Sequence, residues 1–200
     1  MLPRQTFRTM SRLWLLTDAR TDAPPDALSH AGLDAALRAL PRGAGVVFRH
    51  YHLAPDERAR RFARLARLCR QRGLCAVWAG APAEARRYGA QGCYGAAQQV
   101  AGGPAMLRLV TAHSLRELAA ARRARADAVL LSPVFATRSH PGATTLGAVR
   151  WLLLARRSPV PAIALGGMNR RTARRLPGHG WAAIDGLATA RKRHGNPKDS

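Results

Sequence analysis

The residues best suited to bind an anion are two adjacent glycines, Gly166 and Gly167, in the segment AIALGGMN. Because glycine lacks a Cβ atom, its backbone N–H group can approach an oxyanion closely. Asn169 and a basic segment of helical character follow, and the N-terminus of a helix favours negative charge. The pattern predicts a phosphate-binding loop. The alternative is a tight strand-to-helix turn without a ligand.

A second polar group lies earlier in the chain, directly after a short apolar run. It consists of Thr137, Arg138, Ser139 and His140. Hydroxyl, guanidinium and imidazole groups all donate hydrogen bonds to anions. These residues could therefore surround a second anionic group, and the alternative is an exposed loop.

Arg49, Thr111 and His113 each stand at the end of an apolar run. A guanidinium at the end of a buried strand needs a partner, and either a substrate anion or the carboxylate of Asp18 would serve. His113 could act as a general base or position a substrate, with a purely structural role as the alternative. The predicted strand ends offer only two carboxylates, Asp18 and Asp185, so no metal site is predicted.

Eight short apolar runs would position these residues, and each is followed by a polar or helical stretch. Several are rich in Val, Ile or Leu, as is typical of strands buried on both faces. The runs are Leu13–Leu16, Val46–Phe48, Leu74–Trp78, Cys93–Tyr94, Met106–Val110, Ala128–Leu131, Pro161–Leu165 and Ala182–Ile184.

Segments with helical periodicity separate these runs. The clearest spans Asp56–Arg72, between a proline and a glycine that act as start and stop signals. Its apolar stripe consists of Phe62, Leu65, Ala66 and Cys69, and the arginines around that stripe are expected to face solvent. Ser114–Arg125 opens with a capping box of Ser114 and Glu117. The other expected helices are Ala27–Leu40, Ala83–Tyr88, Ala96–Val100 and Gly147–Arg156.

Strands alternating with helices predict βαβ units around a parallel sheet, and eight units close a (β/α)₈ barrel. A small single TIM-barrel domain is expected across the 200 residues, with the barrel at about 12–190. Residues 1–11 and 191–200 are expected to be a flexible leader and a flexible basic tail, and the chain could start at Met1 or Met10. A doubly wound sheet is less favoured because no GxGxxG motif follows the first strand.

The loops after strands seven and eight of such barrels often hold phosphate. Gly186 follows the eighth apolar run. We therefore expect Gly186 to lie beside Gly166 and Gly167 as a further phosphate contact.

The net charge is +22, from 33 Lys and Arg against 11 Asp and Glu. Such a balance favours polyanions in principle. The basic residues are nearly all Arg, with only Lys192 and Lys198 as exceptions, and they are spread along the chain. No base-reading motif is recognisable, so no dedicated nucleic-acid partner is expected.

The three cysteines, Cys69, Cys75 and Cys93, form no CxxC pair. Buried, reduced thiols in a cytoplasmic protein are therefore expected. The longest apolar runs, such as Trp151–Ala155, are far shorter than the roughly 20 residues of a membrane span, so no membrane partner is expected.

Four segments of the chain resemble the thiamin-phosphate synthase and TenI family. They are LWLLTDAR, VVFRHYHL, VTAHSLRELAAARRARADAVLLSPVFATRSHPGATTLG and PAIALGGMNRRTARRL. Their order and spacing match along nearly the whole chain, from about Leu13 to Leu187, and SPVFATRSHPGATTLG followed by AIALGGM is the most specific part. The family fold is a small (β/α)₈ barrel.

The resemblance implies a reaction in which a pyrimidine diphosphate loses pyrophosphate to give a stabilised cation. The ring nitrogen of a thiazole phosphate then attacks that cation and forms thiamin phosphate, with Mg²⁺ normally on the pyrophosphate. TenI relatives instead move a proton on the thiazole ring.

The resemblance also implies roles for single residues. Arg49 and Thr111 match pyrophosphate contacts, and His113 follows Thr111 in the same motif. Gly166 and Gly167 match the loop that holds the thiazole phosphate. The strand-six motif appears as Thr137, Ser139 and His140, with His140 where the family has Lys.

Several family residues are missing here. The Lys of the strand-two motif falls on Tyr51, and an Asn-Asp pair whose Asp holds Mg²⁺ falls on Ala79 and Gly80. The second metal-binding Asp falls within CYGAAQQ, and the catalytic His of TenI falls on Pro133. Mg²⁺ is thus implied by the family, but its usual ligands are absent.

The resemblance therefore leaves two main hypotheses. The chain is a divergent synthase that joins a thiazole phosphate to a pyrimidine diphosphate, or a homologue that binds a small phosphate ester and has lost or changed the reaction. A basic nucleic-acid-associated module is the less favoured third. The oligomeric state is left open, a homo-oligomer included.

Overall fold

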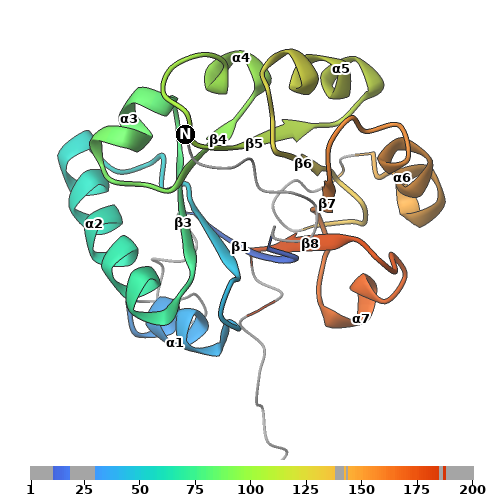
Figure 1. The fold of residues 1–200 in the computed structure, drawn as a ribbon. Coiled ribbons are helices and arrows are strands. Elements are labelled where there is room, and N and C mark those ends of the chain that lie inside the picture. Colours follow the sequence, from blue (N-terminus) through green and yellow to red (C-terminus); the bar gives the residue numbers. More distant parts are fainter. Residues whose placement is uncertain (1–10, 19–29, 138–141, 143, 185–186, 188–200) are drawn as a thin grey trace, which may run out of the picture.

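Eight parallel strands pair in sequence order, and β8 pairs with β1, so the sheet closes into a barrel (Figure 1). The computed structural model describes residues 11–18, 30–137, 142, 144–184 and 187. The strands are β1 Leu13–Thr17, β2 Gly45–Phe48, β3 Cys75–Ala79, β4 Gly92–Gly95, β5 Leu107–Ala112, β6 Ala128–Leu131, β7 Ala162–Ala164 and β8 Gly180–Ala183. The predicted (β/α)₈ barrel is confirmed, and every expected strand overlaps an observed one.

Seven helices in the described part of the chain surround the strands (Figure 1). They are α1 His30–Ala39, α2 Pro55–Arg72, α3 Pro82–Arg87, α4 Ala97–Val100, α5 Leu115–Arg123, α6 Gly147–Ala155 and α7 Arg170–Ala173. None of them is long and apolar enough to cross a bilayer. The expected leader 1–11 lies almost wholly outside the described residues, and the tail 191–200 lies wholly outside them.

Alternate residues of each strand face opposite sides of the sheet, and both sides are packed. The inner side forms a core inside the barrel, which includes Leu16, Val47, Leu109 and Ile163. The outer side packs against the helices through residues such as Phe48 and Trp78. Burial on both faces explains why the strands read as short continuous apolar runs.

In the interior core, a large side chain on one strand packs against a glycine on the neighbouring strand. The indole of Trp14 is 1% exposed, and Trp14 pairs with Gly45 across β1 and β2. A Cβ atom on Gly45 would lie 2.2 Å from the Trp14 ring. The large ring therefore fits only because position 45 has no side chain.

The longest helix, α2, follows its sequence signals. Its buried residues are the predicted stripe of Phe62, Leu65, Ala66 and Cys69. Pro55 occupies the first turn, and Gly73 ends the helix in the left-handed region with φ 65°, as a C-terminal glycine commonly does.

The capping box predicted at α5 forms only in part. The hydroxyl of Ser114 accepts the N–H of Glu117 at 3.3 Å, as predicted. The carboxylate of Glu117 accepts from the N–H of His113, at 2.9 Å, rather than from that of Ser114. The cap therefore includes His113, the first residue after β5.

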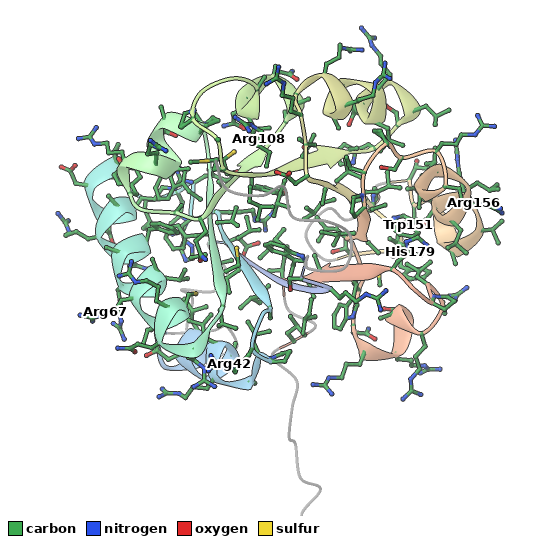
Figure 2. The ribbon with its side chains drawn as sticks, viewed as in Figure 1. Arg42, Arg67, Arg108, Trp151, Arg156 and His179 are labelled. Atoms are coloured by element: carbon green, nitrogen blue, oxygen red, sulfur yellow. The ribbon has the colours of Figure 1, made fainter. Side chains whose placement is uncertain are left out.

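Most arginines lie on the outer helices, but Arg108 does not. Figure 2 shows Arg67 and Arg156 at the periphery, whereas Arg108 on β5 is only 9% exposed. Its guanidinium donates to the carbonyl oxygens of Val100, Gly102 and Pro104. This arginine organises the turn between α4 and β5.

The cysteines are free, as predicted. Cys69 and Cys93 are buried and Cys75 is half-buried. Burial raises the pKa of Cys69 to about 12 and those of Cys75 and Cys93 to about 11. All three are therefore neutral thiols at pH 7 and weak nucleophiles.

Acidification is expected to destabilise the fold through His179. Burial, with a further contribution from Arg12, lowers the pKa of His179 below 6.5, and its ring packs edge-on against Trp151 at 4.9 Å (Figure 2). The folded chain therefore binds this proton less readily than the unfolded chain, so the stabilisation is complete above pH 6.5 and declines below it. Urea unfolding of the native chain at pH 7.5 and 5.0 measures the effect.

The control for this prediction is His179→Phe, which keeps an aromatic edge against Trp151 but cannot titrate. Its free energy of unfolding should fall less between the two pH values than that of the native chain. Equal losses in both proteins would assign the acid sensitivity to other groups.

Candidate functional site at the carboxyl ends of the strands

The carboxyl ends of all eight strands form one rim of the barrel, where sites of this fold are found. Val47 and Leu109 face the interior core. Arg49 follows two residues after Val47, and Thr111 and His113 follow two and four residues after Leu109. With a side-chain period of two, the structure brings these three predicted residues to the inner side of the same rim.

Arg49 is held at the rim by the neighbouring strand. Its Nε donates to the carbonyl oxygen of Thr17 at 3.0 Å, and its Nη2 donates to Asp18 Oδ2 at 3.0 Å. It also interacts with the phenol of Tyr94, whose pKa burial raises to about 12 and Arg49 partly lowers. Of the two partners considered for Arg49, Asp18 is therefore present. Because a guanidinium has five N–H donors, these contacts leave donors for a ligand.

Arg58, in the first turns of α2, joins the same rim, although the sequence placed it in the solvent-facing coat of that helix. Its Nε donates to the carbonyl oxygen of Arg49 at 3.1 Å, and its Nη2 donates to that of Ala79. The guanidinium carbon lies 3.8 Å from the centre of the Trp78 ring. Burial lowers the pKa of Arg58. The sequence signal that could have indicated a rim position for Arg58 is its location just after the β2–α2 loop.

His50 turns away from the rim. It is 1% exposed, its Nδ1 lies 2.8 Å from Thr17 Oγ1, and its ring stacks on Phe48 at 4.3 Å. Its φ of 22° is positive, which is unusual for a residue with a side chain. Sequence reasoning did not find this buried pair, which fixes the start of the β2–α2 loop.

Gly166 and Gly167 follow β7 and have positive φ values of 95° and 63°. A Cβ atom on Gly166 would lie 2.8 Å from Pro133 Cα, and one on Gly167 would lie 2.5 Å from the carbonyl oxygen of Ala136. The two glycines are therefore required for the backbone to pack against the loop after β6. Thr137 is the next residue of that loop after Ala136.

The N–H groups of this glycine loop are available for a ligand. Among the described residues, no hydrogen bond uses the backbone N–H of Gly166, Gly167 or Met168. The carbonyl oxygen of Gly166 accepts from Phe135 N at 3.1 Å. Within the described part of the chain, the loop is therefore fixed through its carbonyl oxygen atoms and not through these N–H groups.

The helix that follows does not supply further donors in the way the sequence suggested. The Asn169 side chain accepts the N–H groups of Arg171 at 2.9 Å and Thr172 at 3.0 Å. These are the groups that an anion at the start of α7 would otherwise bind. The glycine loop, rather than the helix start, is the part that could cradle a phosphate.

His113 is positioned by the neighbouring strand. Its Nδ1 lies 2.7 Å from the carbonyl oxygen of Ser132, which can only accept, so Nδ1 carries a proton. In the neutral ring the other nitrogen, Nε2, is then the acceptor. Ser132 precedes Pro133, which packs against Gly166, so His113 is linked to the glycine loop through these two residues of the loop after β6.

Some predicted residues lie outside the described part of the chain. They are Arg138, Ser139, His140, Asp185 and Gly186. The anion contacts expected of Arg138, Ser139, His140 and Gly186 stay predictions.

In the part of the chain that the structure describes, the carboxylates nearest the rim already have partners. Asp18 pairs with Arg49, Glu84 accepts from Ala81 N and Trp78 Nε1, and Glu117 caps α5. Among the residues that the structure describes, no three His, Cys, Asp or Glu side chains are grouped so that they could hold a metal ion. These residues do not fit a carboxylate-bound Mg²⁺.

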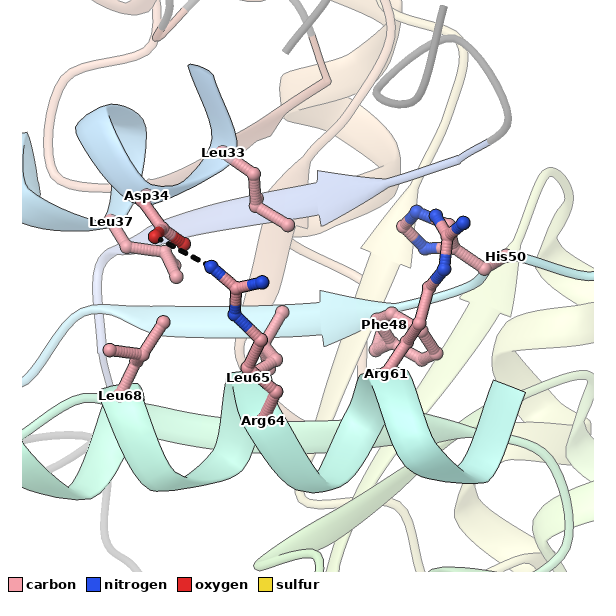
Figure 3. A pocket seen from close by; sticks show the side chains of 9 residues that line it. All are labelled: Leu33, Asp34, Leu37, Phe48, His50, Arg61, Arg64, Leu65 and Leu68. Atoms are coloured by element: carbon pink, nitrogen blue, oxygen red, sulfur yellow. Dashed lines mark hydrogen bonds and ion pairs between the residues drawn. The ribbon is translucent and has the colours of Figure 1, made fainter. Parts of the chain in front are cut away.

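A cavity with about 380 Å³ of empty space, open solvent included, lies outside the barrel between α1 and α2 and reaches Phe48 and His50 at the carboxyl end of β2 (Figure 3). Leu33, Leu37, Leu65 and Leu68 line it. An ion pair between Arg64 and Asp34 at 3.1 Å crosses its edge. The cavity is separate from the glycine loop.

Comparisons with known proteins agree with this architecture. A sequence model of the family described as thiamine monophosphate synthase matches residues 14–190. The comparison with curated protein sequences finds no match.

Solved structures share the fold at low sequence identity. The thiamine phosphate pyrophosphorylase of Pyrococcus furiosus superposes with a TM-score of 0.74 at 20% identity, over 92% of this chain and 89% of that one. The same enzyme of Bacteroides thetaiotaomicron gives 0.56 at 18% identity, over 94% and 90%. A structure described as native KDPGal gives 0.59 at 14% identity, over 90% and 85%.

Proposed function

Since this chain belongs to the thiamine monophosphate synthase family, we propose that it binds a thiazole phosphate through its glycine loop and joins it to a pyrimidine diphosphate with release of pyrophosphate. The observation that carries the proposal is the glycine loop itself. Its backbone N–H groups are unbonded within the described part of the chain, and Ala136, the residue before Thr137, packs against Gly167. Such donors suit a phosphate group.

The other rim residues fit the second substrate. Arg49 and Thr111 stand on the inner side of the rim, where a guanidinium and a hydroxyl can bind a diphosphate. The Nε2 atom of His113 is free to accept a proton or a hydrogen bond when Nδ1 donates to Ser132. Stabilisation of the leaving pyrophosphate would be the main catalytic contribution.

A second candidate function is a phosphate-ester-binding protein without synthase turnover. The engaged carboxylates of the rim favour it, because the family reaction normally uses Mg²⁺. Mixing the two phosphorylated precursors and measuring pyrophosphate release separates the candidates. Release above background supports the synthase, whereas tight binding of thiazole phosphate without release supports the binding protein.

Thr137→Val is expected to weaken binding of thiazole phosphate about tenfold, the effect of one lost hydrogen bond to a charged group. Isothermal titration calorimetry measures the affinity, and the native chain should bind the thiazole alcohol without phosphate far more weakly. Thr144→Val, an exposed threonine of the same loop, is the control and should bind like the native chain. Equal affinities for the phosphate and the alcohol would rule out the proposed phosphate site.

A further inference from the structure

We propose that Arg49 and Arg58 bind a diphosphate group directly, so that this chain holds the anion without a divalent cation. The inference deepens the proposed function, on which it rests, by assigning the manner in which the second substrate is held. Arg49 comes from the end of β2 and Arg58 from the start of α2.

The position of Arg58 is fixed from three sides. Its Nε and Nη2 donate to the carbonyl oxygens of Arg49 and Ala79, at the carboxyl ends of β2 and β3. Its planar group lies on the Trp78 ring at 3.8 Å, and the ring of Tyr51 lies 5.1 Å away. A guanidinium held in this way is preorganised, and its remaining N–H donors can meet an anion with little loss of side-chain freedom.

Arg58 lies beside two positions at which the family resemblance implies a charged residue that this chain lacks, a lysine and a metal-binding aspartate. Tyr51 stands where the strand-two motif has a lysine, and Ala79 precedes Gly80, where a metal-binding Asp would stand. A positive charge on α2 therefore lies beside both positions.

A carboxylate side chain at position 80 would require neighbouring side chains to move. A Cβ atom there would lie 2.5 Å from Glu84 Oε2 and 2.6 Å from Trp78 Nε1. Those two atoms are themselves hydrogen-bonded at 3.4 Å. The end of β3 is thus built around an indole, a carboxylate and a guanidinium, and a metal-binding side chain at position 80 would have to displace the first two.

The local charges also disfavour a cation. Asp18 faces Arg49, Glu84 lies near Arg58, and two guanidinium groups balance these two carboxylates. Among the described residues, an added Mg²⁺ would meet two positive groups and no uncommitted carboxylate, whereas an anion would meet N–H donors of both guanidinium groups.

The test is calorimetric titration of the full chain with inorganic pyrophosphate, once in EDTA and once in millimolar MgCl₂. We expect the affinity in EDTA to equal or exceed that in MgCl₂, because Mg²⁺ complexes pyrophosphate in solution. Binding that appears only with MgCl₂, or tightens tenfold with it, would overturn the proposal.

Single substitutions locate the site. Arg49→Met and Arg58→Met should each weaken pyrophosphate binding in EDTA at least tenfold. Arg60→Met removes the same charge from an exposed position of α2 and should change the affinity less than twofold. If Arg58→Met has no larger effect than Arg60→Met, the anion binds elsewhere on this basic chain and the proposal is wrong.

Two further measurements separate this inference from other failures. Arg58→Lys keeps the positive charge but loses the planar guanidinium, so its pyrophosphate affinity should lie between those of the native chain and Arg58→Met. It takes the place of Arg58→Met in the test if that variant folds poorly. Thiazole phosphate binding should survive in Arg58→Met. If the native chain binds thiazole phosphate but binds pyrophosphate only with Mg²⁺, this inference fails and the proposed function stands. If it does not bind thiazole phosphate, the proposed function fails.

Discussion

Gly167→Ala is expected to destabilise the folded chain by about 2–5 kcal/mol, from backbone strain and overpacking together. The φ of 63° at Gly167 is unfavourable for any residue with a Cβ atom. The new methyl group would also lie 2.5 Å from the carbonyl oxygen of Ala136 and 2.8 Å from Phe135 Cβ. Denaturant unfolding, followed by circular dichroism, measures the loss.

The matched control is Gly178→Ala. Gly178 has a similar φ of 81°, but a Cβ atom there would meet no other atom within 4 Å. Its cost should be the strain alone, about 1–2 kcal/mol. Similar losses at both positions would show that the β7 loop does not press against the β6 loop as described. The same geometry means that a charged substitution such as Gly167→Asp would disturb folding before it reported on phosphate.

Arg108→Met should destabilise the folded chain by about 1–3 kcal/mol, because it leaves the buried carbonyl oxygen of Val100 without its donor and removes the bonds to the more exposed carbonyl oxygens of Gly102 and Pro104. The guanidinium donates to Val100 O at 3.0 Å, Gly102 O at 2.6 Å and Pro104 O at 3.0 Å. Methionine can fill much of the volume of the arginine stem, but it cannot replace these bonds. Urea unfolding gives the change in stability.

Arg67→Met is the control for this substitution, since Arg67 is exposed on α2 (Figure 2). It should change stability by less than about 0.5 kcal/mol. A comparable loss in both variants would indicate that net charge, rather than the bonds of Arg108, sets the stability.

The barrel could be predicted because each strand and helix leaves a pattern in its own short stretch of sequence. Strands packed on both faces give continuous apolar runs, and α2 gives a stripe at helical spacing that its buried residues reproduce. The rim could be predicted only in part. The partner of Arg49 depends on the register between β1 and β2, which places Thr17 opposite Phe48 and so Asp18 next to Arg49. The residues near Arg49 in the sequence do not determine how β2 aligns with β1.

Two features of the site were beyond sequence reasoning for different reasons. Arg58 belongs to the polar side of α2 in the sequence pattern, and only the packing of α2 on the ends of β2 and β3 brings it to the rim. Asn169 was expected beside a helix start open to an anion. Its own side chain occupies those N–H groups, and that competition is decided by a side-chain rotation rather than by residue type.

Trp14 and Gly45 place a constraint on how this barrel can diverge over evolutionary time. Each position limits the other, because the ring occupies the space of the missing side chain. A gain of a side chain at position 45 is tolerated only after, or together with, a reduction at position 14. Among descendants of this chain the two positions should therefore change as a pair, while the rim loops above them vary without that constraint.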